Sequence, residues 1–297
     1  MRQLNFHDRV GLGWRAELAA GILLNASLID VIEVVVDDYF SAPRARLRAL
    51  ETLAAQIPII CHGVSLGLAS THPVNEKRLS GLARVMGFLR PEFWSEHLAF
   101  VRAGGNEIGH LAAPPRTRET ISGALKNLQR TGHVVGSLPH LENIATLVDP
   151  PCSTLDEAAW TSAILHESGT GMLLDLHNLY ANACNFGRDP FAEILRFPLA
   201  AVRLVHLSGG HWIHEPAGAA RFPHAKRLLD DHVHDIPDIV FDMLERLAEN
   251  APHDLTVIIE RDGCYPEMEI LIEQINRARS ALQAGRLRRK EVYHECA

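Results

Sequence analysis

GMLLDLHN, residues 171–178, joins a short apolar run to the polar end DLHN. The run is too short for a typical helix, and it shows no clean alternation of polar and apolar residues. This pattern is typical of a strand buried on both faces. AVRLVHLSG, residues 201–209, has the same character and carries His206 near its end. A sheet with two buried faces is covered by helices, so these segments predict a parallel sheet in an α/β fold.

Similar apolar runs recur along the chain, with segments of helical period between them. The expected strands are RVGLGW (9–14), DVIEVVV (30–36), IPIICH (57–62), FWSEHLAF (93–100), HVVGSLPHLEN (133–143), GMLLDLHN (171–178), AVRLVHLSG (201–209) and LTVIIERDG (255–263). The expected helices include 44–56, 74–90, 118–132, 238–250 and a last one over 266–284. Eight strand–helix units predict closure into a (β/α)8 TIM barrel. The alternative is an open doubly wound sheet, although GLGWR at 11–15 lacks the third glycine of a phosphate-binding loop.

The composition indicates a globular protein of one barrel. We expect one domain over residues 1–297, with 285–297 as a C-terminal tail. With 47% hydrophobic residues the chain can bury a full core. No apolar run reaches the roughly 18 residues of a membrane span. The N-terminal residues also lack the apolar segment of a signal peptide, so we expect a cytoplasmic protein that binds no membrane.

Charge and cysteine usage exclude further classes. The formal net charge is −7, whereas proteins that bind nucleic acid usually carry a basic face. We therefore expect no nucleic-acid partner, and RLRRK at 286–290 is interpreted as part of a solvated tail. The five cysteines are scattered without a CxxC pair, which disfavours a disulfide framework and a thiolate zinc site.

Histidine is frequent, with 17 residues, and several histidines and carboxylates lie in or at the ends of the expected strands. They are Glu33, His62, His97, Glu142, Asp175, His177, His206 and Glu260. In such barrels the chemistry lies at the C-terminal ends of the strands. Unpaired buried charges are costly, and metal binding offsets that cost. A lone strand-end histidine is more often hydrogen-bonded in the core, but six consecutive strand ends of this kind predict a metal site.

Asp230 and His232, in the loop after the seventh expected strand, are spaced so that both side chains can reach one ion. The alternative for this segment is an exposed polar loop. The whole candidate set offers nitrogen and oxygen ligands, which suit Fe, Mn or Zn, and composition alone does not choose among them.

Nine motifs of the chain occur together in one order. They are GLGWR (11–15), EVVVDDYF (33–40), HGVSL (62–66), SEHLAF (95–100), LEN (141–143), LLDLHNLYANACN (173–185), VHLSGG (205–210), DDHVHDIPD (230–238) and ERDG (260–263). With these motifs the chain resembles the multinuclear non-haem iron-dependent oxidases from about residue 10 to about residue 280. That family includes the enzymes that modify cysteines during methanobactin and thiaglutamate biosynthesis.

The resemblance implies a barrel similar to those of xylose isomerase and endonuclease four. It implies two or three Fe ions in mixed Fe(II)/Fe(III) states, with O2 as co-substrate. The implied substrate is a cysteine of a ribosomally made precursor peptide, which a small partner protein usually delivers. Carried over residue by residue, the implied ligands of one ion are His62, His97 and Glu142, those of the next are Glu142, Asp175, His206 and Glu260, and those of a third are Asp230 and His232 with His177 or Asn178.

The sequence departs from the family pattern at two positions: Asp37 stands where many relatives have Glu, and His177 where many have Asn. The second change would strengthen the third site or shift its occupancy.

Arg15, Glu33, Asn143 and Asn182 are expected to bind substrate or to orient ligands, and their alternative role is to tie down loops. The segment 209–227, rich in Gly, Pro, His and aromatic residues, is expected to be a lid or docking loop, with an ordinary surface insertion as the alternative.

Three other functions fit the same residues. A zinc phosphodiesterase resembling an endonuclease would use two or three zinc ions to activate water, although the acidic charge disfavours a nucleic-acid substrate. A divalent-metal sugar isomerase normally has an active-site lysine, and none of the eight expected strands contains one. A metal-storage or metal-delivery protein is the non-enzymatic alternative.

Overall fold

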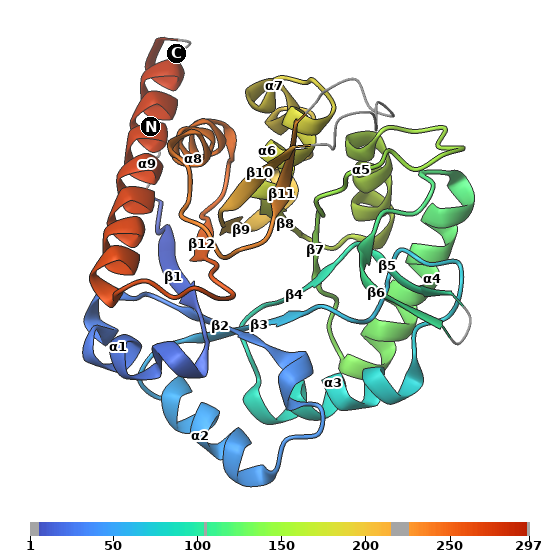
Figure 1. Ribbon diagram of the computed structural model, residues 1–297, viewed down its shortest axis with the longest axis horizontal. Coiled ribbons are helices and arrows are strands. Elements are labelled where there is room, and N and C mark those ends of the chain that lie inside the picture. Colours follow the sequence, from blue (N-terminus) through green and yellow to red (C-terminus); the bar gives the residue numbers. More distant parts are fainter. Residues whose placement is uncertain (1–5, 104–105, 215–225, 296–297) are drawn as a thin grey trace.

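The computed structural model describes residues 6–103, 106–214 and 226–295, and its centre is a closed barrel of parallel strands (Figure 1). The order around the barrel is β1-β12-β9-β8-β7-β4-β3-β2. The bounds are β1 Arg9–Gly13, β2 Ile32–Val35, β3 Ile59–Gly63, β4 Trp94–His97, β7 His140–Glu142, β8 Met172–Asp175, β9 Val202–Leu207 and β12 Thr256–Ile259. Each lies within or overlaps one of the expected strands. The prediction of a TIM barrel is confirmed, and the open sheet is wrong because β1 pairs in parallel with β12.

Helices surround the barrel on its outer face (Figure 1). They are α1 Ala19–Leu24, α2 Arg44–Ala54, α3 Glu76–Leu89, α4 Arg118–Val135, α5 Glu157–Ser168, α6 Leu176–Asn185, α7 Pro190–Ile194, α8 Asp238–Asn250 and α9 Met268–Glu295. Short 3-10 turns lie at Ala16–Leu18, Ala26–Leu28, Val36–Tyr39 and Leu199–Ala201. The sequence fixes several helix ends through capping. Thr117 and Thr120 form a reciprocal capping box at the start of α4, and Gly136 ends that helix at φ 88°.

Two antiparallel hairpins extend from the barrel and were not expected from the sequence. One pairs β5 (Phe100–Ala103) with β6 (Asn106–Ala112), and the other pairs β10 (Gly210–His214) with β11 (Lys226–Asp230). The second hairpin occupies both ends of the segment 209–227, which was expected to be a loop. Residues 215–225 lie outside the described residues, so a lid or docking role for this segment stays a prediction.

Two boundaries expected from the sequence were wrong. The expected strand 133–143 begins inside α4, because the capped helix continues to Val135 and only His140–Glu142 joins the barrel. The last helix was expected to end at residue 284, before a solvated tail, but α9 continues to Glu295. Arg286 is 6% exposed, because its guanidinium binds Asp8 and the carbonyl oxygens at the end of α8.

None of the helices in the described part of the chain combines the length and the apolar character that crossing a membrane requires.

Candidate metal centre

Five barrel strands share one pattern at or just beyond their ends. In each, a buried apolar residue is followed two positions later by a histidine or a carboxylate that could bind a metal. The pairs are Val31 and Glu33, Ile60 and His62, Leu173 and Asp175, Leu204 and His206, and Ile258 and Glu260. Side chains alternate along a strand, so both members of a pair share one face of it. The apolar members form a core cluster of their own, apart from the layer between barrel and helices. The polar members lie one level nearer the C-terminal mouth and are at most 7% exposed.

Glu142, at the end of β7, faces histidines on two sides. Its Oε2 lies 3.4 Å from Nε2 of His62 and 3.4 Å from Nε2 of His97. Its Oε1 lies 3.3 Å from Nδ1 of His206. Neither oxygen has a hydrogen-bond partner, although the side chain is 1% exposed. The two oxygens therefore face two different groups of ligand atoms, as a bridging carboxylate does.

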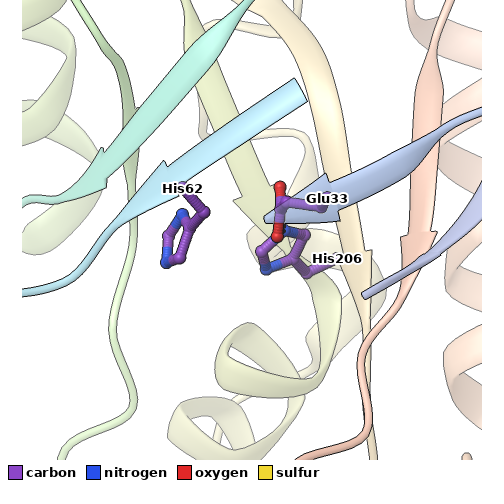
Figure 2. Close-up of side chains that lie close together, drawn as sticks. All are labelled: Glu33, His62 and His206. Atoms are coloured by element: carbon purple, nitrogen blue, oxygen red, sulfur yellow. Dashed lines mark hydrogen bonds and ion pairs between the residues drawn. The ribbon is translucent and has the colours of Figure 1, made fainter. Parts of the chain in front are cut away.

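His206 and His62 are oriented by polar neighbours. Figure 2 shows the Glu33 carboxylate beside the His206 ring, with the His62 ring next to them; His206 Nε2 lies 3.0 Å from Glu33 Oε2. His62 Nδ1 lies 2.8 Å from Ser95 Oγ, and the other ring nitrogen of His62, Nε2, therefore faces Glu142. The ligand atoms of Glu33, His62 and His206 all lie within 4.8 Å of one another. Glu33, which the sequence placed among possible outer residues, thus lies inside the cluster.

His232 enters the cluster from the loop after β11. Its Nδ1 lies 3.4 Å from Glu260 Oε2, and its ligand atom groups with those of Asp175 and Glu260 within 4.8 Å. Its Nε2 lies 2.7 Å from Asp230 Oδ2, and Asp230 Oδ1 lies 2.6 Å from His177 Nδ1. Asp230 is therefore held between two histidines. The division into three sites that the family resemblance implies stays a prediction.

The backbone at His232 is held in a costly conformation. Its φ is 56°, in the left-handed region that residues other than glycine rarely adopt. Its N–H donates to Gly209 O at 3.0 Å, and its carbonyl oxygen accepts from the Asp262 N–H at 2.8 Å. These two bonds fix the loop between the ends of β9 and β12 and thereby aim the His232 ring inward.

The glycines of SGG, at the start of β10, let this loop approach the barrel. A Cβ on Gly210 would collide with the carbonyl oxygen of Leu229 and would lie 2.6 Å from Cε1 of His177. A Cβ on Gly209 would collide with the carbonyl oxygens of His234 and Asp235. The glycine pair is required by this close packing and not by a positive φ.

The acidic side chains of the cluster need positive charge beside them. Burial raises the pKa of Asp175 well above its usual range, and the neighbouring carboxylates of Asp230 and Glu142 raise it further. Burial also acts to raise the pKa of Glu142, but His97, His206 and His62 outweigh it and lower the pKa to about 2. The pKa of His206 is well above its usual value despite burial, because Glu33, Glu260 and Glu142 surround it.

The remaining predicted site residues act mainly on the backbone or on the carboxylates. Asn143 donates to Asp175 O at 3.0 Å and accepts from Asp175 N at 2.9 Å. Asn182 binds Ile144 O and Thr146 N, so it ties the loop after β7. Arg15 hydrogen-bonds Asp262 and lies 4.0 Å from Glu260 Oε1.

Sequence reasoning missed three polar residues at the cluster. Asp262 Oδ2 lies 3.3 Å from His232 Nδ1, Ser208 Oγ donates to Asp230 Oδ1 at 3.3 Å, and Ser95 binds His62. The signal for each was its place two residues along the strand or loop from a named ligand: Asp262 after Glu260, Ser208 after His206 and Ser95 before His97.

Unpartnered buried atoms test whether these residues suit a metal. The buried atoms without a hydrogen bond include His62 Nε2, both oxygens of Glu142, Asp175 Oδ2, His177 Nε2, Asn178 Oδ1, His206 Nδ1 and Glu260 Oε2. Buried polar atoms are rarely left without partners, and those of His62, Glu142, Asp175, His206 and Glu260 belong to groups of ligand atoms that share members. They are imidazole nitrogens and carbonyl or carboxylate oxygens, the donors that bind first-row divalent ions. The residues present therefore fit a metal centre.

The closed parallel barrel with this cluster at its mouth defines a (β/α)8 barrel protein with candidate metal-binding groups. The chain belongs to the family described as RiPP precursor modification enzyme MbnB/TglH/ChrH, whose family model matches residues 9–283. RiPPs are ribosomally made peptides that are modified after translation. The family expected from the nine motifs is confirmed.

Individual comparisons agree with this assignment. A UPF0276 protein from Streptomyces avermitilis is 31% identical over 282 residues, 92% of this chain and 55% of that protein, so the chain spans about half the length of this relative. A UPF0276 protein from Anaeromyxobacter sp. is 28% identical over 284 residues, 93% of this chain and 96% of that protein. A solved L-ribulose 3-epimerase aligns over 96% of this chain and 98% of its own, with a TM-score of 0.60 and 11% identity. That likeness shows the fold alone.

Proposed function

We propose that the protein is a multinuclear iron-dependent oxidase that uses O2 to modify cysteine residues of a ribosomally made precursor peptide, with the help of a partner protein. The family supports an enzyme that modifies precursor peptides. The observation that carries the finer proposal is Glu142, whose two unpartnered oxygens face His62 and His97 on one side and His206 on the other. A carboxylate in this position favours neighbouring ions that share a ligand.

The ligand set supports a division into adjoining sites. His62, His97 and Glu142 would hold one ion, and Glu142, Asp175, His206 and Glu260 the next, with Glu33 beside His206. Asp230 and His232, with His177 or Asn178, would hold a third. The bound irons supply the electron transfer to O2 and the Lewis acidity toward a thiolate.

The protein supplies orientation around these ions. Ser95 fixes the ring of His62 through Nδ1, Glu33 does so for His206 through Nε2, and Asn143 fixes the backbone at Asp175. Neighbours of this kind set the tautomer and direction of a ligand. Arg15 and Asp262 place a paired cation and carboxylate beside Glu260, at the rim where a peptide would approach.

The sulfur that reacts is proposed to come from the substrate. Cys61, next to His62, is fully buried in the apolar layer between barrel and helices, and burial raises the pKa of its thiol. No cysteine belongs to the ligand groups found among the described residues. A thiolate from the peptide would therefore meet no competing cysteine among the described residues that would hold the irons.

The proposal is tested first on the neighbouring reading frames, where we expect a short cysteine-containing precursor peptide and a small partner protein. The enzyme, loaded with iron, is incubated with both, and the peptide is analysed by mass spectrometry. We expect a mass change that requires O2 and that disappears when all peptide cysteines are replaced by serine. An equal change under strict anaerobiosis would exclude an oxidase.

Elemental analysis decides between the oxidase and a zinc phosphodiesterase. Protein made in iron-rich medium is expected to contain at least two irons per chain. Stoichiometric zinc without iron, in protein that hydrolyses phosphodiesters, would favour the hydrolase instead.

A further inference from the structure

Three side chains outside the inner cluster converge on the outer face of the β10–β11 hairpin. His211 lies on β10, and Asp231 and His234 follow β11. Asp231 Oδ2 lies 2.5 Å from Nδ1 of His211 and 3.0 Å from Nδ1 of His234. The two rings lie 5.0 Å apart, centroid to centroid. One ligand atom from each residue therefore falls within 4.8 Å of the other two.

The alternation of side chains along the β10–β11 hairpin separates this group from the inner cluster. In the hairpin Gly210 pairs with Asp230, and His211 pairs with Leu229. Neighbouring residues face opposite sides of a strand, so Asp230 faces His177 and His232 while Asp231 faces His211 and His234. None of the three outer residues takes part in the inner groups found among the described residues.

The backbone holds the three side chains in place. The N–H of Val233 donates to Asp231 Oδ1 at 3.0 Å, which fixes the carboxylate. The carbonyl oxygens of His234 and Asp235 pack against Gly209, so His234 is tied to the start of β10. The two histidines come from segments joined by this packing and by the strand pairing, and little rearrangement is required to bring their ligand atoms together.

Two imidazoles and one carboxylate form a donor set for divalent transition metals. Ligand bonds of about 2.0–2.2 Å to a tetrahedral zinc ion place neighbouring donor atoms roughly 3.3–3.6 Å apart. Asp231 Oδ2 lies 3.0 Å from His234 Nδ1 and 2.5 Å from His211 Nδ1, so a small outward movement of the two imidazoles reaches that spacing. The side chains of His211 and His234 are 42% and 49% exposed, so water can fill the other coordination positions. The open surroundings also make this group weaker and more exchangeable than a buried centre.

We propose that His211, Asp231 and His234 form a separate, solvent-accessible site for one divalent transition-metal ion at the rim of the barrel mouth. The site adjoins the inner centre through the dipeptide Asp230-Asp231, but it shares no ligand with it. It does not depend on the chemistry proposed for the inner centre.

The test measures binding of Zn²⁺ to the protein with its inner metals in place. Inner metal content is first determined by elemental analysis, and Zn²⁺ is then titrated by isothermal calorimetry. We expect one further equivalent of Zn²⁺. His211→Ala and His234→Ala should each weaken the binding of this Zn²⁺ by at least about 10-fold. Removing a residue that only hydrogen-bonds to a metal ligand already lowers metal affinity by about 10- to 100-fold, and these two residues would be ligands themselves. His166→Ala, which removes an exposed histidine of α5, is the matched control and should bind like wild type.

A second measurement distinguishes the loss of a zinc ligand from a general structural effect of the substitution. X-ray absorption of the added zinc in the wild-type protein should show imidazole nitrogens, and the inner metal content of both variants should match that of wild type. The proposal fails when wild type binds no further equivalent, or when His211→Ala and His234→Ala bind it as tightly as wild type does.

Discussion

Asp230 and Asp231 are neighbours in the chain, yet their carboxylates serve histidines on opposite sides of the β10–β11 hairpin. Asp230 accepts from His177 and His232 inside the barrel mouth, and Asp231 accepts from His211 and His234 outside it. A shift of the β11 register by one residue would exchange the two faces, so the hairpin pairing determines which carboxylate enters the inner cluster.

Replacing Glu142 by Gln is expected to lower the metal content at two adjoining positions. The amide keeps the volume of the side chain but removes the charge that faces three histidines. Iron content by elemental analysis should fall by more than it does in His232→Ala, where only the third ion is expected to leave. Equal losses in the two variants would contradict the proposed bridging role of Glu142.

Arg286→Ala should destabilise the protein strongly. The guanidinium binds both oxygens of Asp8, at 2.8 and 2.9 Å, and its loss leaves that carboxylate without its ion-pair partner, with the Leu255 N–H still donating to Oδ1, and removes the donor to several carbonyl groups. Breaking a buried pair costs about 3–5 kcal/mol. The comparison is Arg288→Ala on the same helix, whose side chain is 62% exposed and whose removal should change stability by less than about 0.5 kcal/mol. Urea unfolding measures both, and similar effects of the two would argue against the role of Asp8.

Gly210→Ala should destabilise the hairpin, because the new methyl group collides with the Leu229 carbonyl and approaches His177. Overpacking of this kind costs about 1–3 kcal/mol. Gly87→Ala is the control: nothing lies within 4 Å of its would-be Cβ on α3, and alanine should stabilise that helix by up to about 1 kcal/mol. Thermal unfolding compares the two, and a neutral Gly210→Ala would show that the hairpin yields easily.

His140 is expected to make stability depend on pH. Burial, with a smaller effect of Arg203, lowers its pKa from an ordinary 6.5 to about 4. Between these values the unfolded chain binds a proton that the folded chain does not, so the free energy of unfolding falls as the pH falls. The loss from this residue amounts to about 2 kcal/mol near pH 5.

His140→Gln should therefore flatten the fall in stability between about pH 7 and pH 5. Urea unfolding at both pH values gives the difference, which is compared within each variant so that any general effect of the substitution cancels. His166→Gln, at an exposed position, should keep the wild-type slope. An unchanged slope in His140→Gln would disprove the assignment.

The barrel could be predicted from the sequence because most barrel strands, such as MLLD of β8 and TVII of β12, are short apolar runs, although WSEH of β4 and HLE of β7 are more polar. The two hairpins could not be predicted from the sequence. KRLLD of β11 and GHWIH of β10 mix polar and apolar residues, and their pairing joins positions on either side of residues 215–225. Strand β6 has no buried residue along its length, so it lacks the hydrophobic pattern that marks a core strand.

The candidate ligands were predictable for the same reason, since a charged residue at the end of an apolar strand is conspicuous. Contacts between loops could not be predicted from the sequence. Asp262 approaches His232 only because the loops after β11 and β12 are joined by a backbone hydrogen bond. Glu33 stands inside an apolar run, and only barrel closure shows that its carboxylate meets His206 from β9.

His232 adopts a left-handed backbone that glycine would adopt at lower cost. The backbone conformation alone would favour glycine at this position, because strain of this kind costs on the order of 1–3 kcal/mol. The strained backbone holds the imidazole where it contacts Asp230 and Glu260. A His232→Gly variant should accordingly relax the backbone but take a buried partner from the carboxylates of Asp230 and Glu260, so ring and backbone act on stability in opposite directions at this position.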